Sequence, residues 1–297
     1  KPNTEWYEYD WLSKAGGGGL YIPQTQDLKK SLPVHFHIGS SSMLDTSNSI
    51  NVFYEDRWGN IWAGTKSGLY VRRKLPTNFF HTIRASEVDT NTPSHNALSS
   101  FVQNSDGSIL VGTNSGIDKF EWLDDAKTTY EFSRLNRPTD SSYTNKNVQC
   151  LIESKDKQIW IGTKRKIYYY EPATDKFYER DETNHFLSEN HLSLVKVFYE
   201  DNFSNIWIGF SSGGVAVWQH EKKEFRLYVH LKNEDVRVIL KDSNGYMWIG
   251  TRNGLFKMKA TIHIPAENDV PCQYRHRAND PNSLLDNWVT SLCIDSE

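Results

Sequence analysis

The histidines, glycines and cysteines of this 297-residue sequence do not form a familiar catalytic or metal site. None of the ten histidines makes a His-x-x-x-His pair with a carboxylate. His35 and His37 have the spacing of metal ligands, but a pair on an edge strand is the simpler interpretation. The run Gly16–Gly19 lacks the Lys-Ser/Thr and the helix that a phosphate-binding loop requires, which predicts an expanded turn instead. Three cysteines are too few for a disulfide framework, and we interpret Cys150 and Cys293 as buried, inert thiols. We therefore expect no metal and no cofactor.

Four aspartates recur at the ends of similar apolar segments, at Asp56, Asp201, Asp242 and Asp295. Because they recur with the segment itself, a role in capping turns fits better than a unique pair of catalytic carboxylates. The turns also lack the glutamate of a twelve-residue calcium loop. The pattern favours a chain that is not an enzyme.

Composition excludes several other classes of protein. The chain has 34 basic and 37 acidic residues, a net charge of -3, which argues against electrostatically driven binding of nucleic acid. It has no apolar run of eighteen residues that would span a bilayer. Aromatic residues make up 13% of the chain, which indicates a large folded core.

The elements that position these residues come from a repeat. Its glycine falls at positions 64, 112, 162, 209 and 250, so the intervals are 48, 50, 47 and 41 residues. A period of about 46 residues is typical of propeller blades. The repeated segments are Asn60–Thr65, Ser108–Thr113, Gln158–Thr163, Asn205–Phe210 and Tyr246–Thr251.

Each repeat has the pattern of four short antiparallel strands. An alternating apolar run such as Val148–Glu153 forms the first strand, and the segment with the glycine forms the second. A tryptophan recurs in the second strand, with Leu110 in its place once, and we expect it to pack against the neighbouring blade. The glycine two residues later allows adjacent backbones to approach closely. The tryptophans are Trp62, Trp160, Trp207 and Trp248.

The repeats predict an all-β propeller of four-stranded antiparallel blades with almost no helix. Residues 1–38 resemble the second to fourth strands of a blade, residues 39–288 make five blades, and residues 289–297 supply one first strand. That last strand either closes the ring or opens the next blade. The sum is six blade-equivalents, or a ring of seven if part of the chain is missing.

One end of the blades is the expected binding face. The loops after the second strand and those that lead into the next first strand emerge at the same end, and they are rich in amides, imidazoles and basic side chains. Basic residues gathered by the repeat would attract anions although the chain is net acidic. The candidate ligand-binding residues are Lys66, Asn147, Lys164, Arg165, His191, Arg252, Asn253 and Trp288.

These segments resemble the two-component regulator propeller repeat, in which a strand ends in Asp and a Gly-Asn turn precedes Ile-Trp-Ile-Gly-Thr. The segments from Asn145 to Thr163 and from Arg277 to Asp295 follow it nearly end to end. The departures are Leu110 for Trp, Phe210 for Thr, and a missing glycine before Ile167.

The resemblance implies the periplasmic sensor region of a membrane-spanning histidine kinase. Such kinases are often hybrids that carry a response regulator, and they regulate glycan uptake in Bacteroidetes. The implied partners are an oligosaccharide and a neighbouring propeller or β-sandwich domain of the same receptor, with a homodimer left open.

Three functions are compatible with this sequence. The first is a module that senses glycan breakdown products, with a neutral or an acidic oligosaccharide as its ligand. The second is a structural or protein-interaction propeller without its own small-molecule site, and the third is a propeller polysaccharide lyase or glycosidase. Clustered exposed aromatics and amides would favour the first, and an extended apolar patch would favour the second.

Overall fold

The computed structural model describes residues 11–14, 17–20, 50–57, 60–66, 68–72, 80–124, 129–135, 147–259 and 270–294. These residues form five four-stranded antiparallel sheets and one two-stranded sheet. The chain divides into two compact units, residues 1–98 and 99–297, and each is described by itself. No helix in the described ranges is long and apolar enough to cross a membrane.

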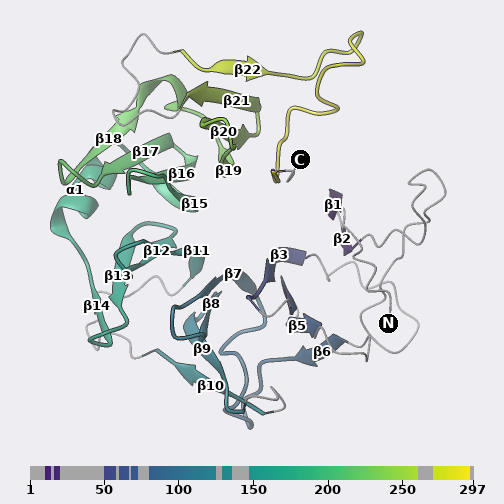
Figure 1. Ribbon diagram of the computed structural model, residues 1–297, viewed down its shortest axis with the longest axis vertical. Coiled ribbons are helices and arrows are strands. Elements are labelled where there is room, and N and C mark those ends of the chain that lie inside the picture. Colours follow the sequence, from purple (N-terminus) through teal and green to yellow (C-terminus); the bar gives the residue numbers. More distant parts are fainter. Residues whose placement is uncertain are drawn as a thin grey trace, which may run out of the picture. The chain divides into compact units, whose positions relative to one another are not determined.

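The first unit holds the two-stranded sheet and one blade (Figure 1). The two-stranded sheet pairs β1 (Trp11–Lys14) with β2 (Gly17–Leu20). The blade consists, in order, of β3 (Ile50–Glu55), β4 (Ile61–Thr65), β5 (Leu69–Arg72) and β6 (Phe80–Ile83).

The second unit holds four blades, and β7 begins at its boundary. In every blade the strands lie in chain order from first to fourth. The first two blades are β7 (Leu98–Gln103), β8 (Ile109–Thr113), β9 (Gly116–Trp122) and β10 (Tyr130–Arg134), then β11 (Val148–Glu153), β12 (Ile159–Thr163), β13 (Ile167–Glu171) and β14 (Lys176–Tyr178). The next two are β15 (Ser193–Glu200), β16 (Ile206–Ser212), β17 (Gly214–Gln219) and β18 (Glu224–Tyr228), then β19 (Val236–Lys241), β20 (Tyr246–Thr251), β21 (Gly254–Lys259) and β22 (Cys272–Tyr274).

The hydrophobic core of the second unit lies between successive blades. Trp207 packs with Val236 and Ile239 of the following blade, and Trp160 packs with Val195 and Phe198 of its following blade. This confirms the expected role of the recurring tryptophan. First strands of neighbouring blades lie side by side, as β11, β15 and β19 show in Figure 1.

The recurring glycine allows this close packing. A Cβ on Gly209 would meet Val236 Cγ1 at 2.5 Å, and one on Gly162 would meet Val195 Cγ1 at 2.7 Å. Both distances are shorter than real contacts of a Cβ, so a side chain there would push the blades apart. The predicted close approach of backbones is confirmed.

The predicted number of blades is wrong. The described residues form five four-stranded blades, not six or seven. β1 and β2 pair only with each other as the two-stranded sheet, and residues 289–294 form no strand, with a single backbone bond from Val289 N to Thr251 O at 2.9 Å joining them to β20. His35 and His37, which were expected to lie on an edge strand, are outside the described residues, as is Asp295.

Three smaller expectations also need correction. Gly17–Gly19 belong to β2 and are not an expanded turn, since they pair with β1. Cys293 is exposed, whereas Cys150 is buried and burial raises the pKa of its thiol. The connection before β15 contains a helix that the strand pattern did not predict, α1 (Asp181–Glu189), and a single 3-10 turn, η1 (Val229–Leu231), follows β18.

Candidate functional site

A bulge near the start of the first strand positions polar side chains in three blades of the second unit. The register shifts between Val148 and Cys150 on β11, and likewise between Val195 and Val197 on β15 and between Val236 and Val238 on β19. In each case one extra residue lies between the apolar pair. A bulge re-aims the side chain that it inserts. The inserted residues are Gln149, Lys196 and Arg237.

The inserted side chains of adjacent blades contact one another. Lys196 Nζ donates to Gln149 Oε1 at 3.0 Å, and the amide of Gln149 donates in turn to Asn147 Oδ1. Arg237 lies close enough to Lys196 that its positive charge acts on the ammonium. A row of polar groups therefore crosses three blades along their first strands.

Asp235 joins this row to the turn between β20 and β21. Its Oδ2 accepts from Arg237 Nη2 at 2.7 Å and lies 3.1 Å from Arg252 Nε, while its Oδ1 accepts from Ser211 Oγ at 3.0 Å. The guanidinium of Arg252 lies 4.7 Å from the ring centroid of Trp288, within the range of a cation–π contact. We call Gln149, Lys196, Asp235, Arg237, Arg252 and Trp288 the inner-strand cluster.

The inner-strand cluster has an excess of positive charge and an unfilled donor. Three cations surround one carboxylate, and Arg237 Nε is buried with no hydrogen-bond partner among the described residues. Burial, with a smaller effect of Arg237, lowers the pKa of Lys196. A buried donor without an acceptor is costly, so an acceptor supplied by a ligand would stabilise it. Trp288 adds an aromatic surface that is 48% exposed.

The expectation that the two kinds of loop share one end of the blades holds in the second unit. The backbone of Arg252 donates to Asp235 O at 3.1 Å, which joins the β20–β21 turn to the connection before β19. Between neighbouring blades, the backbone of Leu194 at the start of β15 donates to Lys164 O in the β12–β13 turn at 2.7 Å. Two of the predicted residues, Arg252 and Trp288, are members of the cluster.

The other predicted residues lie at different distances from this cluster. Asn147 borders it through Gln149. Asn253 follows Arg252, but its side chain is engaged by Glu234 Oε1 at 3.1 Å and by Arg275. The exposed Lys164, Arg165 and His191 lie at or beside the β12–β13 turn, and none of their side chains has an interaction partner within residues 147–259. Lys66 is exposed on the first unit.

The sequence-based prediction missed Gln149, Lys196, Asp235 and Arg237. A signal for three of them was present, because a polar residue stands between two apolar ones at the same position of β11, β15 and β19. If side chains alternate strictly between the two faces of a strand, this residue has no special position. The bulge changes the direction of its side chain. No group of three or more His, Cys, Asp or Glu residues gathers for a metal within the described part of the chain.

Comparisons with known proteins agree with the repeat. Residues 45–67, 142–165 and 230–253 match the family model described as two component regulator propeller. A protein named Histidine kinase P4 from Formosa agariphila is 26% identical over 181 residues, which are 54% of this chain and 12% of that protein. The resemblance to two-component regulator propeller repeats is confirmed.

Solved structures show the same fold. The extracellular domain of a hybrid two component system from B. thetaiotaomicron has a TM-score of 0.68 at 18% identity, over 97% of this chain and 36% of that one. A streptogramin B lyase has a TM-score of 0.58 at 13% identity, over 92% of this chain and 87% of that one. At such identities the likeness shows the propeller fold alone. The chain spans about a third of the length of the first of these structures and about an eighth of the kinase.

Proposed function

We propose that this chain, being built of two-component regulator propeller repeats, is the extracytoplasmic ligand-sensing propeller of a hybrid sensor histidine kinase. The ligand would be an oligosaccharide released by glycan breakdown, and the kinase would regulate genes for carbohydrate use. The chain itself would bind the ligand without turning it over. The support comes from the repeat family, the named kinase relative and the propeller fold.

The inner-strand cluster is the observation that carries this proposal. A half-exposed indole beside amide and guanidinium groups suits a sugar, because one face of a sugar ring is apolar and its hydroxyls need donors and acceptors. The excess of cations over carboxylates favours an acidic sugar, such as a uronic acid or a sulfated one.

The rest of the receptor would surround this chain. We place the propeller in the periplasm, with a neighbouring propeller or β-sandwich domain of the same receptor as its contact and with a homodimer as a further assembly. Residues 1–38 would contribute part of a blade, residues 39–288 the five blades, and residues 289–297 a first strand. Val289 supports this last assignment, because its Cγ1 lies 2.7 Å from the position of a Cβ on Gly250, as Val236 does against Gly209.

Isothermal titration with neutral, uronic-acid and sulfated oligosaccharides tests the proposal. We expect an acidic oligosaccharide to bind, and Arg252→Ala or Trp288→Ala to weaken binding about tenfold or more, which corresponds to about 1.4 kcal/mol. Arg165→Ala is expected to have little effect, since Arg165 lies outside the cluster. Arg226→Ala on β18 is the matched control for loss of an exposed arginine.

Two results would contradict the proposal. Absence of binding by any glycan would favour the structural or protein-interaction propeller. Cleavage of a bound glycan, detected by chromatography of the ligand after incubation, would favour a lyase or glycosidase.

A further inference from the structure

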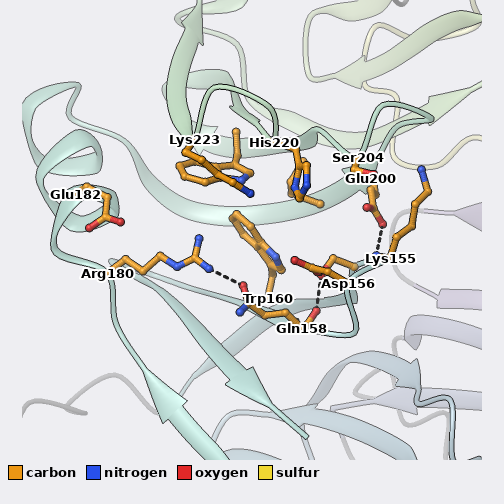
Figure 2. Close-up of a pocket in the computed structure, with 13 residues that line it drawn as sticks. Lys155, Asp156, Gln158, Trp160, Arg180, Glu182, Glu200, Ser204, His220 and Lys223 are labelled. Atoms are coloured by element: carbon orange, nitrogen blue, oxygen red, sulfur yellow. Dashed lines mark hydrogen bonds between the residues drawn. The ribbon is translucent and has the colours of Figure 1, made fainter. Parts of the chain in front are cut away.

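A cavity of about 490 Å³ lies between the β11–β14 blade and the β15–β18 blade. It is lined by the β11–β12, β15–β16 and β17–β18 turns, so it lies at the opposite end of the strands from the inner-strand cluster. Figure 2 shows Trp160 near its centre, with Arg180 on one side and Asp156 on the other. The volume is within the range of sites for small molecules.

The cavity coincides with a departure from the repeat. In three blades, the aspartate six residues before the tryptophan accepts from the indole Nε1: Asp56 from Trp62 at 3.0 Å, Asp201 from Trp207 at 2.9 Å and Asp242 from Trp248 at 2.8 Å. In the blade with Leu110 no indole needs this acceptor. Only at Trp160, among the described blades, is a tryptophan kept while the aspartate is replaced, by Ser154.

Ser154 does not replace the missing carboxylate as an acceptor, because its hydroxyl turns toward two other oxygens and forms no hydrogen bond with Trp160 Nε1. Its hydroxyl is engaged by Asp156 and by the carbonyl of Gln158, the latter at 2.7 Å. Trp160 Nε1 therefore has no acceptor within residues 147–259, and the same is true of the indole Nε1 of Trp218. The two rings line the cavity with their centroids 6.3 Å apart.

Cationic donors complete this side of the cavity. Arg180 gives one N–H to Gln158 Oε1 at 2.9 Å, and its guanidinium lies 4.3 Å from the centroid of Tyr169. Its remaining N–H groups, the ammonium of Lys223 and the ring of His220 have no acceptor within residues 147–259. Donors without acceptors call for an acceptor in the ligand, and a planar carboxylate matches the fork of a guanidinium.

Three carboxylates line the cavity, those of Asp156, Glu182 and Glu200. Glu200 Oε2 accepts from Lys155 N at 2.8 Å, and Asp156 Oδ1 accepts from Ser154. Glu200 and Asp156 each keep one carboxylate oxygen that has no partner within residues 147–259. Those oxygens would accept from a hydroxyl or an ammonium group of the ligand.

We propose that this cavity binds a small carboxylate that also carries hydrogen-bond donors, with its carboxylate against Arg180 and the indole N–H of Trp160. Sugar acids and amino acids share this chemistry. The site is separate from the inner-strand cluster and does not depend on the glycan-sensing proposal.

Calorimetric titration of the whole chain with sodium glucuronate, L-serine, acetate and glucose tests this site. We expect glucuronate or L-serine to bind at millimolar concentration or below, and the better of the two identifies the second group of the ligand as hydroxyl or ammonium. Acetate lacks the hydrogen-bond donors and glucose lacks the carboxylate, so each is expected to bind at least tenfold more weakly. Arg226→Ala, at an exposed arginine that lines neither this cavity nor the inner-strand cluster, is expected to leave this binding unchanged.

Ser154→Asp is the decisive variant, since it restores the aspartate of the repeat. The new carboxylate would accept the indole N–H of Trp160 and repel the ligand, so we expect affinity to fall at least tenfold. Ser154→Ala adds no charge and is expected to change affinity less than threefold. Lys223→Gln should weaken binding several-fold, whereas Lys222→Gln, at the exposed neighbour that does not line the cavity, should not.

The proposal is overturned by any of three results. The first is that neither glucuronate nor L-serine binds at concentrations up to about 10 mM. The second is that glucuronate and glucose bind with equal affinity while L-serine does not bind. The third is that Ser154→Asp leaves the affinity unchanged. If thermal unfolding shows that Ser154→Asp is not folded, the pair Lys223→Gln and Lys222→Gln decides, and equal affinity of these two variants overturns the proposal.

Discussion

A single aspartate performs two functions in the turn between the first and second strands. Asp201 Oδ1 accepts from the backbone of Asn205 at 3.0 Å, and its Oδ2 accepts from Trp207 Nε1 at 2.9 Å. The predicted capping of the turn is confirmed. The bond to the indole was not predicted, because the six-residue separation becomes a contact only when the hairpin folds.

Asp201→Ala is expected to destabilise the protein by about 1–3 kcal/mol, since it leaves a buried indole N–H and backbone N–H without an acceptor. Urea denaturation measures the free energy of unfolding. Asn202→Ala, at the exposed neighbour, is the control. Equal stability of the two variants would show that the aspartate contributes little to the turn.

Lys196 makes stability depend on pH. Burial and Arg237 lower its pKa below the ordinary value of 10.5, so the unfolded chain holds this proton more tightly than the folded one. The charged lysine therefore costs stability at neutral pH, and the cost is relieved as pH rises from the folded pKa to 10.5. Asp235, which favours the charged form, and the buried Cys150 act on the same ammonium.

Lys196→Met is expected to raise the thermal midpoint at pH 7 and to remove this alkaline gain. Thermal unfolding of wild type and variant between pH 7 and pH 10.5 measures both, and the difference between the two proteins cancels the titration of tyrosines. Lys222→Met, at an exposed lysine, is the control. A lower midpoint for Lys196→Met at pH 7 would mean that the hydrogen bond to Gln149 and the attraction of Asp235 outweigh the cost of burial.

At the scale of elements, the glycine of the second strand sets the spacing between blades. The first strand of the next blade places a valine on this glycine, at Gly112 with Val148, Gly162 with Val195 and Gly209 with Val236. The bulge immediately follows the valine in β11, β15 and β19. The contact between valine and glycine therefore also determines where the polar side chain of the bulge lies.

Gly209→Ala is expected to destabilise the protein by about 1–3 kcal/mol, because its Cβ would meet Val236 Cγ1 at 2.5 Å and Val197 Cγ1 at 2.6 Å. Urea denaturation of Gly209→Ala, Val236→Ala and the double variant gives the coupling between the two sites. Since the second alanine removes one of the clashing methyl groups, we expect the double variant to lose less stability than the sum of the single ones. Additive losses would contradict a direct contact.

At the scale of the whole molecule, the last blade shows what a neighbouring blade contributes. Trp62, Trp160 and Trp207 are buried, whereas the equivalent Trp248 is only partly buried. Only residues 275–294 follow this blade in the described part of the chain, and among them Val289 takes the place of a next first strand on Gly250. The count of six came from adding the strands expected in residues 1–38 and the first strand expected at residues 289–297 as one further blade. The described residues form only a two-stranded sheet at the first place and no strand at the second, because a single first strand keeps the sequence pattern without the partners that make a sheet.

The sequence by itself determined the repeat, the order of strands in each blade, and the roles of the tryptophan, the glycine and the capping aspartate. These features could be predicted because each depends on residues that lie close together in the sequence, within one strand or one hairpin of the repeat. The tertiary structure decided which polar groups meet, because residues one or two repeats apart, such as Gln149, Lys196 and Arg237, come together only through bulges in packed blades. It also decided which hydrogen-bond donors remain without an acceptor. Trp160 Nε1 is one of them, because the Ser154 hydroxyl bonds to Asp156 and Gln158 in the folded turn.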